Sequence, residues 1–240
     1  MKIIDAANLD YKAVNHALRE TDDICTLEGC CGQRFIAAGM SDKELIINGI
    51  PGNALGAYLN NAVITVNANA QDAVGDTMNE GKILIYGNIG DAAGYAMRGG
   101  KIYVQGNAGY RAGIHMKEYK EKVPVMVIGG RAGSFLGEYQ AGGIIIVLGL
   151  HTDGRHIVGN FPCTGMHGGK MFLRSGCQDI KFPRQVTARP ADKDDLEDIR
   201  GYLTEYSADF GYSVNDILSA PFTVITPDSN NPYKQMYVTN

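Results

Sequence analysis

Short apolar runs recur at a constant spacing along the chain. Four of them, at residues 45–47, 64–66, 83–85 and 102–104, lie nineteen residues apart. Runs of this length, rich in Ile and Val and bounded by glycine clusters, predict β-strands. Further runs at residues 144–147 and 170–174 extend the pattern toward the C-terminus.

Glycines recur with the same period between these runs. Three glycine positions follow each run, and an apolar residue, methionine in most repeats, follows the third. A glycine at a fixed place in every repeat indicates a positive φ, or packing so close that a Cβ would clash. We therefore assign a structural role to Gly49, Gly52, Gly56, Gly75, Gly87, Gly90, Gly94, Gly106, Gly109, Gly113, Gly130, Gly133 and Gly137.

A fixed period built from one strand and one turn cluster is typical of a solenoid, in which each coil stacks on the one before it. Equivalent residues then lie about 4.8 Å apart, so Leu45, Ile64 and Ile83 are expected to form an inward ladder. A left-handed hexapeptide helix would show an aliphatic residue every six positions. The pattern instead favours an all-β core formed by a single-stranded, right-handed parallel β-helix with short N- and C-terminal helices.

The segments outside the repeat divide the chain into three regions. Residues 1–23 predict a helical cap over the first coil, and residues 24–186 form the β-helix. A charged insertion at 117–122 shifts the period by five residues. Residues 187–240 predict helices near 191–206 and 214–218, a strand at 222–226 and an extended tail.

The middle position of each strand should face away from the core, yet it is mostly apolar. Solvent-facing strands usually carry polar residues there. Either the C-terminal helices or a partner is expected to cover this column. It consists of Ile46, Thr65, Leu84, Tyr103, Val127, Ile146 and Phe172.

Composition narrows the classes of function. The net charge of −4 comes without a basic patch interleaved with aromatics, which argues against nucleic acid. No long uncharged apolar stretch suggests a membrane span, and the first residues lack the apolar core of a signal peptide. Five cysteines without a framework spacing indicate reduced thiols and a cytoplasmic protein.

Two constellations have residue types that could support chemistry. Asp72 and Asp91 occupy equivalent slots on adjacent coils, where stacked carboxylates could act as in a retaining glycosidase; an Asp beside a turn glycine more often bonds local N–H groups. His151, Cys163 and His167 are metal-ligand types, but their spacing fits a surface excursion better. We predict no catalytic, cofactor-binding or metal-binding residue.

The glycine arrangement resembles the GXGXG domain, the C-terminal β-helix of the glutamate synthase large subunit. The resemblance is carried by the segments at 87–100 and 106–109, and by 159–169, which is similar to an Asn-Phe-x-x-Gly-Met-Ser-Gly-Gly coil. It covers nearly the whole chain. His167 stands where Ser is usual, Cys163 where a small residue is usual, and Ala68 and Gln71 replace glycines.

The resemblance implies a free-standing version of that domain, a non-catalytic scaffold in a split glutamate synthase. Expected partners are a glutamine amidotransferase and a synthase subunit carrying FMN and an iron–sulfur cluster; this chain would bind neither, and it could form a homo-oligomer. One alternative is the subunit of formylmethanofuran dehydrogenase that shares the glycine repeat. Another is an independent carbohydrate-active enzyme that uses Asp72 and Asp91.

Overall fold

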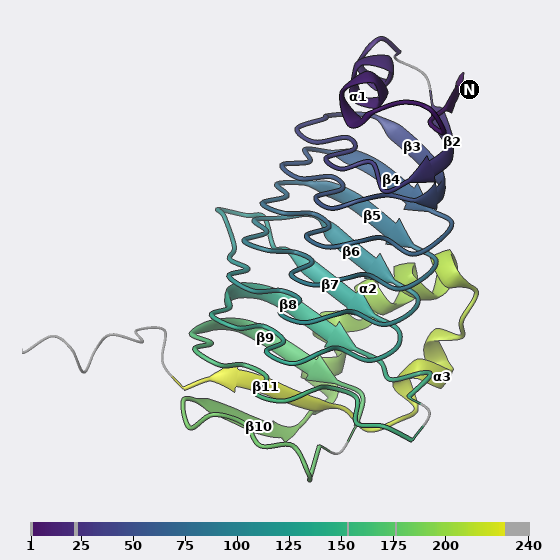
Figure 1. The fold of residues 1–240 in the computed structure, drawn as a ribbon. Coiled ribbons are helices and arrows are strands. Elements are labelled where there is room, and N and C mark those ends of the chain that lie inside the picture. Colours follow the sequence, from purple (N-terminus) through teal and green to yellow (C-terminus); the bar gives the residue numbers. More distant parts are fainter. Residues whose placement is uncertain (1, 22–23, 153, 176, 229–240) are drawn as a thin grey trace, which may run out of the picture.

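The computed structural model describes residues 2–21, 24–152, 154–175 and 177–228, which fold into a solenoid (Figure 1). Within these residues eleven strands form one sheet, in the order β1-β2-β3-β4-β5-β6-β7-β8-β9-β11-β10. The elements are β1 (Lys2–Asp5), α1 (Tyr11–Arg19), β2 (Cys25–Cys31), β3 (Glu44–Ile50), β4 (Ala62–Val66), β5 (Gly81–Ile85), β6 (Lys101–Val104), β7 (Val125–Ile128), β8 (Ala141–Val147), β9 (Gly168–Leu173), β10 (Val186–Pro190), α2 (Lys193–Phe210), α3 (Val214–Leu218) and β11 (Thr223–Pro227).

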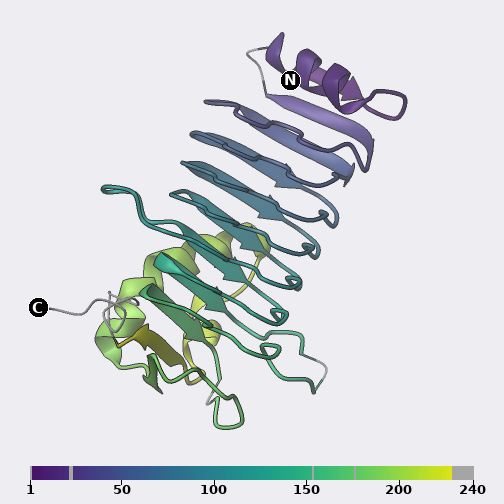
Figure 2. The ribbon, with the colours of Figure 1, turned by 60° about the vertical axis from the view of Figure 1, so that its left-hand side comes forward.

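Each coil contributes one strand, and consecutive strands from β1 to β9 pair in parallel. Leu45 pairs with Ile64, Ile64 with Ile83, and Ile83 with Ile102. Every step is nineteen residues, so the predicted inward ladder is confirmed. The coils wind in a right-handed sense and stack along one axis (Figure 2).

The interior of the solenoid is apolar along its whole length. Methionine side chains fill it at the position three residues after the third glycine, where a flexible thioether adapts to irregular space. Gln140 takes this position in one coil and is fully buried; its Nε2 donates to the carbonyls of Gly142 and Gly143 at 3.2 and 3.0 Å. The buried methionines of the column are Met40, Met78, Met97, Met116 and Met166.

The charged insertion is accommodated without a break in the sheet. Lys101 of β6 pairs with Val125 of β7, so this step spans 24 residues. From the insertion, Glu118 accepts a hydrogen bond from the N–H of Gly143 at 2.9 Å. Gly143 lies at the bulge where β8 shifts register against β9. The insertion therefore supports the next coil, and the period resumes as predicted.

The N-terminal segment contains a strand as well as the predicted helix. β1 pairs in parallel with β2, so the described part of the N-terminal segment extends the sheet in addition to capping it. The sequence pattern did not indicate this strand, because only Ile3 and Ile4 are apolar and no glycine cluster precedes them. α1 begins after its N-cap Asp10 and buries Val14 and Leu18 over the end of the interior.

The C-terminal segment turns back along the sheet and then closes its end. α2 starts after Asp192, whose side chain accepts the Asp195 N–H while the Asp195 carboxylate accepts the Asp192 N–H, both at 3.0 Å. β11, predicted from the sequence, pairs antiparallel with both β9 and β10. The sequence predicted neither β10 nor the antiparallel pairing. The predicted tail, residues 229–240, lies outside the described residues.

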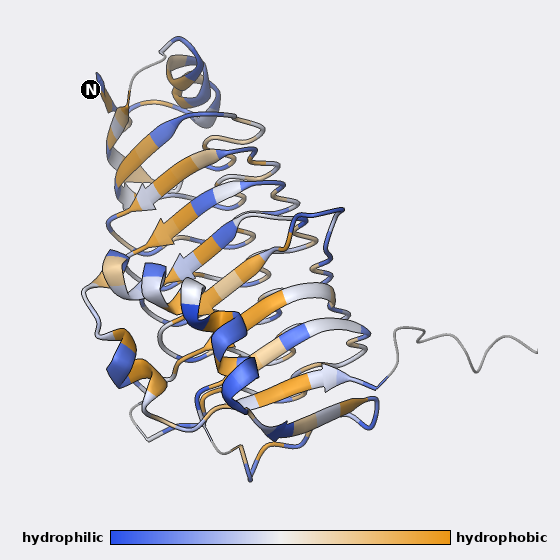
Figure 3. Ribbon diagram, turned by 180° about the vertical axis from the view of Figure 1, so that it is seen from behind, coloured by the Kyte–Doolittle hydropathy of each residue, from blue (hydrophilic) through white to orange (hydrophobic). Residues whose placement is uncertain are grey.

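α2 and α3 cover the outward face of the sheet from β5 to β9 (Figure 3). Tyr103 and Phe172 of the strands pack with Leu203 and Tyr206 of α2, and all four side chains are fully buried. Here the apolar outward column is covered by the chain's own C-terminal helices. Within the described ranges, no helix combines the length and hydropathy needed to span a bilayer.

Candidate functional site

The third glycine of each coil lies in a turn of unusual backbone conformation. Gly94 has φ +67°, and its neighbours Ala92 and Ala96 have φ +53° and +50°. Alanine is therefore tolerated at positive φ in the same turn. What distinguishes Gly94 is direction, because a Cβ there would lie 2.6 Å from Cε of Met126 in the interior. Positive φ and inward packing together favour glycine at this position.

The second glycine of each coil is held by close stacking. Gly109 lies outside the positive-φ region, but a Cβ on it would lie 2.3 Å from Oδ1 of Asp91 and 2.7 Å from the carbonyl carbon of Gly90. Glycine is thus required for two different reasons at two positions of the coil. Positive φ acts at Gly94, whereas contact with the preceding coil acts at Gly109.

Asp72 and Asp91 stack on adjacent coils, but their carboxylates bind the backbone. Oδ1 of Asp72 accepts the N–H of Asp91 at 2.9 Å, and Oδ1 of Asp91 accepts the N–H of Tyr110 at 2.7 Å. Asn53 makes the same contact one coil earlier, at 3.3 Å. A glycosidase needs one carboxyl group to donate a proton and another to attack or activate water. The local hydrogen bonds instead explain both residues as parts of the turn.

The candidate metal ligands His151, Cys163 and His167 lie in different surroundings. Cys163 is fully buried, 3.5 Å from Sδ of Met171, and burial raises its pKa to about 12. Nε2 of His151 lies 3.5 Å from the hydroxyl of Tyr212, and Nδ1 of His167 lies 3.0 Å from the carbonyl two residues before it. Among the described residues, no three His, Cys, Asp or Glu side chains form a group that could hold a metal ion.

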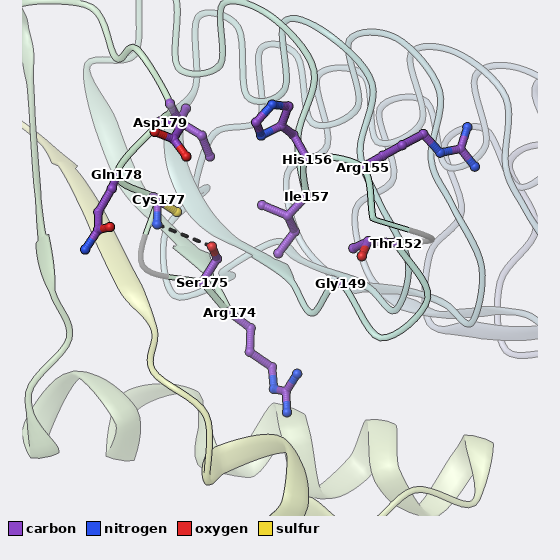
Figure 4. Close-up of a pocket in the computed structure, with 11 residues that line it drawn as sticks. Gly149, Thr152, Arg155, His156, Ile157, Arg174, Ser175, Cys177, Gln178 and Asp179 are labelled. Atoms are coloured by element: carbon purple, nitrogen blue, oxygen red, sulfur yellow. Dashed lines mark hydrogen bonds between the residues drawn. The ribbon is translucent and has the colours of Figure 1, made fainter.

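A cavity of about 420 Å³ lies between this excursion and the segment after β9 (Figure 4). Its lining includes His156, Cys177 and Asp179, which are residue types found in nucleophilic sites. Burial raises the pKa of the Cys177 thiol, which opposes formation of the reactive thiolate. Arg174 turns away from the cavity and donates to the carbonyl of Ile217 at 2.8 Å. Among the described lining residues, the Cys177 thiol is therefore disfavoured as a nucleophile.

The five cysteines, all within the described residues, form no disulfide bond. Near the N-terminus, Cys30 is buried and its thiol contacts Oε1 of Gln33 at 3.4 Å. Burial raises the pKa of Cys30 to about 11, whereas the neighbouring Cys31 is exposed. Cys30 thus serves as the small residue of the first coil.

Aromatic side chains of adjacent coils form two ring contacts that the sequence pattern did not indicate, one stacked and one tilted. The ring of His115 stacks on that of Tyr139, with centroids 5.2 Å apart and an interplanar angle of 11°. Phe161, which is 61% exposed, contacts Phe135 with centroids 5.2 Å apart. Their recurrence at equivalent repeat positions was the available signal. It was obscured because other coils carry Ala, Arg, Thr or Gly there.

Known proteins match this chain over most of its length. The family described as GXGXG motif matches residues 9–227. An uncharacterized protein of Methanocaldococcus jannaschii is 43% identical over 249 residues, which covers 98% of this chain and 95% of that protein. Both matches include the solenoid and the helices that pack on it.

Proposed function

Because the chain belongs to the GXGXG motif family, we propose that it is a non-catalytic scaffold subunit of a split glutamate synthase. In this proposal a glutamine amidotransferase releases ammonia, and a second partner carrying FMN and an iron–sulfur cluster converts 2-oxoglutarate to glutamate. This chain contributes a stiff prism on which the two partners are positioned. It binds neither cofactor.

The proposal depends mainly on one observation: polar side chains of the coils are hydrogen-bonded to the backbone of the solenoid. The stacked Asp72 and Asp91 carboxylates accept backbone N–H groups of the next coil, and the buried Gln140 amide binds carbonyls of its own coil. Cys163 and Cys177 have raised pKa values caused by burial. Side chains that could act as acid, base or nucleophile thus stabilise the solenoid, which suits a structural role.

The architecture also supports a role in holding partners. Each coil is hydrogen-bonded to the next along its strand and its turns, so bending the prism would break many bonds at once. Surfaces far apart along its axis therefore keep a fixed relation. Such stiffness is useful when one partner must deliver a small molecule to another.

Purification of the tagged chain from its native cells tests this proposal. We expect an amidotransferase and a flavoprotein to co-purify, with a flavin absorption spectrum and glutamine-dependent formation of glutamate. The isolated chain should be colourless and inactive. Co-purification with a molybdenum- or tungsten-containing partner would instead support the formylmethanofuran dehydrogenase alternative. Hydrolysis of polysaccharide by the isolated chain would contradict both scaffold functions.

A further inference from the structure

The outward side chains of β1 to β4 are not covered by α2 or α3 (Figure 3). We call this surface the open face. Ile3 and Val63 are 64% and 37% exposed on it, and Ile46 between them is half-buried. By strand alternation and pairing, the outward positions of the open face are Ile3, Asp5, Thr26, Glu28, Glu44, Ile46, Asn48, Val63, Thr65 and Asn67. Thr26 is buried among them, at 6% exposed.

The open face is continuous with the outward surface of β5 to β9, which α2 covers. Thr65 pairs with Leu84, and Leu84 pairs with Tyr103, which packs under α2. α2 ends over β5, where the rings of Phe210 and Tyr86 lie 4.9 Å apart. The helix therefore stops at the strand that borders the open face. The outward column continues without a covering helix and alternates threonine with isoleucine, through Thr65, Ile46, Thr26 and Ile3.

The surface under α2 and the open face differ in charge. Under α2, lysines of the strands face acidic residues of the helix, each pair with an N–O distance of 2.6 Å. These pairs are Lys82 with Asp209, Lys101 with Glu205, and Lys170 with Asp198. In β3, two strands before Lys82 of β5, the equivalent position is occupied by Glu44.

The other charged residues of the open face are also acidic. Asp5 and Glu28 are paired neighbours on β1 and β2, and Nδ2 of Asn48 donates to Glu28 at 2.6 Å. Within the described part of β1 to β4, no outward position holds Lys or Arg. The helix that suits this surface therefore carries basic residues at its edges, the reverse of α2.

We propose that the open face docks an amphipathic helix of a partner protein, with lysine or arginine flanking its apolar stripe. This inference rests on the proposed scaffold function, and it specifies where one partner binds and by what chemistry. The partner helix lies across β1 to β4 as α2 lies across β5 to β9. Its apolar stripe covers Ile3, Ile46 and Val63, and its basic edges face Glu44 and Glu28.

A matched pair of peptides tests the proposal directly. The probe has the sequence of residues 193–212 with Asp198, Glu205 and Asp209 replaced by lysine, so that the apolar stripe of α2 is retained and its edge becomes basic. The unaltered acidic peptide is the control. Fluorescence anisotropy with the full chain should show saturable binding of the basic peptide, and binding of the acidic peptide at least about tenfold weaker.

Variants of the chain locate the binding. Glu44→Lys and Val63→Asp should each weaken binding of the basic peptide by about tenfold or more. Glu121→Lys makes the same charge change on the exposed insertion and should leave binding unchanged. Melting temperatures of the variants confirm that each is folded. Equal binding of the two peptides, no binding of either, or insensitivity to Glu44→Lys and Val63→Asp would overturn the proposal.

The self-associated state is checked in the same samples. If light scattering shows a dimer that Val63→Asp dissociates, a second copy occupies the open face and the partner helix is excluded. Peptide binding requires no glutamine, flavin or partner subunit. Failure of this test therefore removes the docking surface without deciding the glutamate synthase proposal. Failure of the co-purification test, in turn, would leave the peptide-binding result unchanged.

Discussion

Gln71 occupies a position that glycine holds in neighbouring coils, and its effect on the stack is visible. Next to it, the N–H of Asp72 lies 3.3 Å from Oδ1 of Asn53. In the following coil, where Gly90 replaces Gln71, the corresponding bond to Asp91 measures 2.9 Å. A Cβ at this position is therefore accompanied by a longer hydrogen bond between coils.

Gly109→Ala should lower the free energy of unfolding by about 2 kcal/mol, because the added methyl overlaps the backbone of the preceding coil. Gly201→Ala is the matched control, since Gly201 lies exposed within α2 with no atom within 4 Å of its would-be Cβ. Alanine there should stabilise the protein by about 0.5–1 kcal/mol. Chemical denaturation measures both. Equal effects would contradict the stacking explanation.

Asp91 offers a second test at this scale. Asp91→Asn keeps an oxygen that can accept the N–H of Tyr110, so the stability should remain nearly unchanged. Asp91→Ala removes the acceptor and should cost about 1 kcal/mol. Asparagine already makes this contact at Asn53, two coils earlier in the same column. Asn88 and Asn107 make an analogous contact at another turn position. A large loss of stability in Asp91→Asn, or a catalytic activity lost in it, would contradict the structural role.

At the scale of elements, the attachment of α2 depends on its first turn. Asp195 accepts hydrogen bonds from Arg189 at 2.5 and 3.1 Å and from the N–H of Asp192. Burial raises the pKa of Asp195, but these hydrogen bonds outweigh burial, and the pKa lies below its ordinary value of 3.8. The ionised carboxylate is therefore favoured in the folded state.

This shift predicts a pH dependence. A carboxyl group whose pKa is lowered by folding stabilises the fold above its unfolded pKa, and that stabilisation is lost as the pH falls through the native pKa. Asp195→Asn should therefore lower the unfolding free energy at neutral pH, and the difference from wild type should shrink as the pH falls below the ordinary pKa of 3.8.

Glu197→Gln removes an exposed ion pair with Arg200 on the same helix and serves as the control. It should have little effect at either pH, because exposed pairs contribute little. Urea titrations across this pH range measure both differences. A difference for Asp195→Asn that stays constant with pH would contradict the assignment.

The sequence predicted the repeated coils, the helices α1, α2 and α3, and β11, but it missed the terminal strands β1 and β10. β3 to β8 were predictable because each coil repeats the same spacing of apolar and glycine residues. β10 was not, since four of its five residues are exposed and its partner β11 lies over thirty residues further on. In the same way, the sequence identified Asp72 and Asp91 as stacked. It also indicated hydrogen bonds to local N–H groups, but only the coordinates show that these donors belong to the next coil.

At the scale of the whole molecule, both ends of the solenoid are closed. α1 covers the N-terminal end of the interior, and the antiparallel pair of β10 and β11 completes the other end. Closed ends discourage stacking of one solenoid on another. The sequence indicated the apolar outward column, but the point where its cover ends depends on the length and path of α2. The open face remains as the surface offered for assembly.

Omission of this chain from a reconstituted complex tests the scaffold role most directly. The chain, the amidotransferase and the flavin-containing subunit are expressed together and separately, and glutamate formation from glutamine and 2-oxoglutarate is measured alongside the mass of the assembly. We expect a three-component complex that forms glutamate, and loss of both assembly and glutamine-dependent activity when this chain is left out. Full assembly and activity without it would contradict the scaffold role.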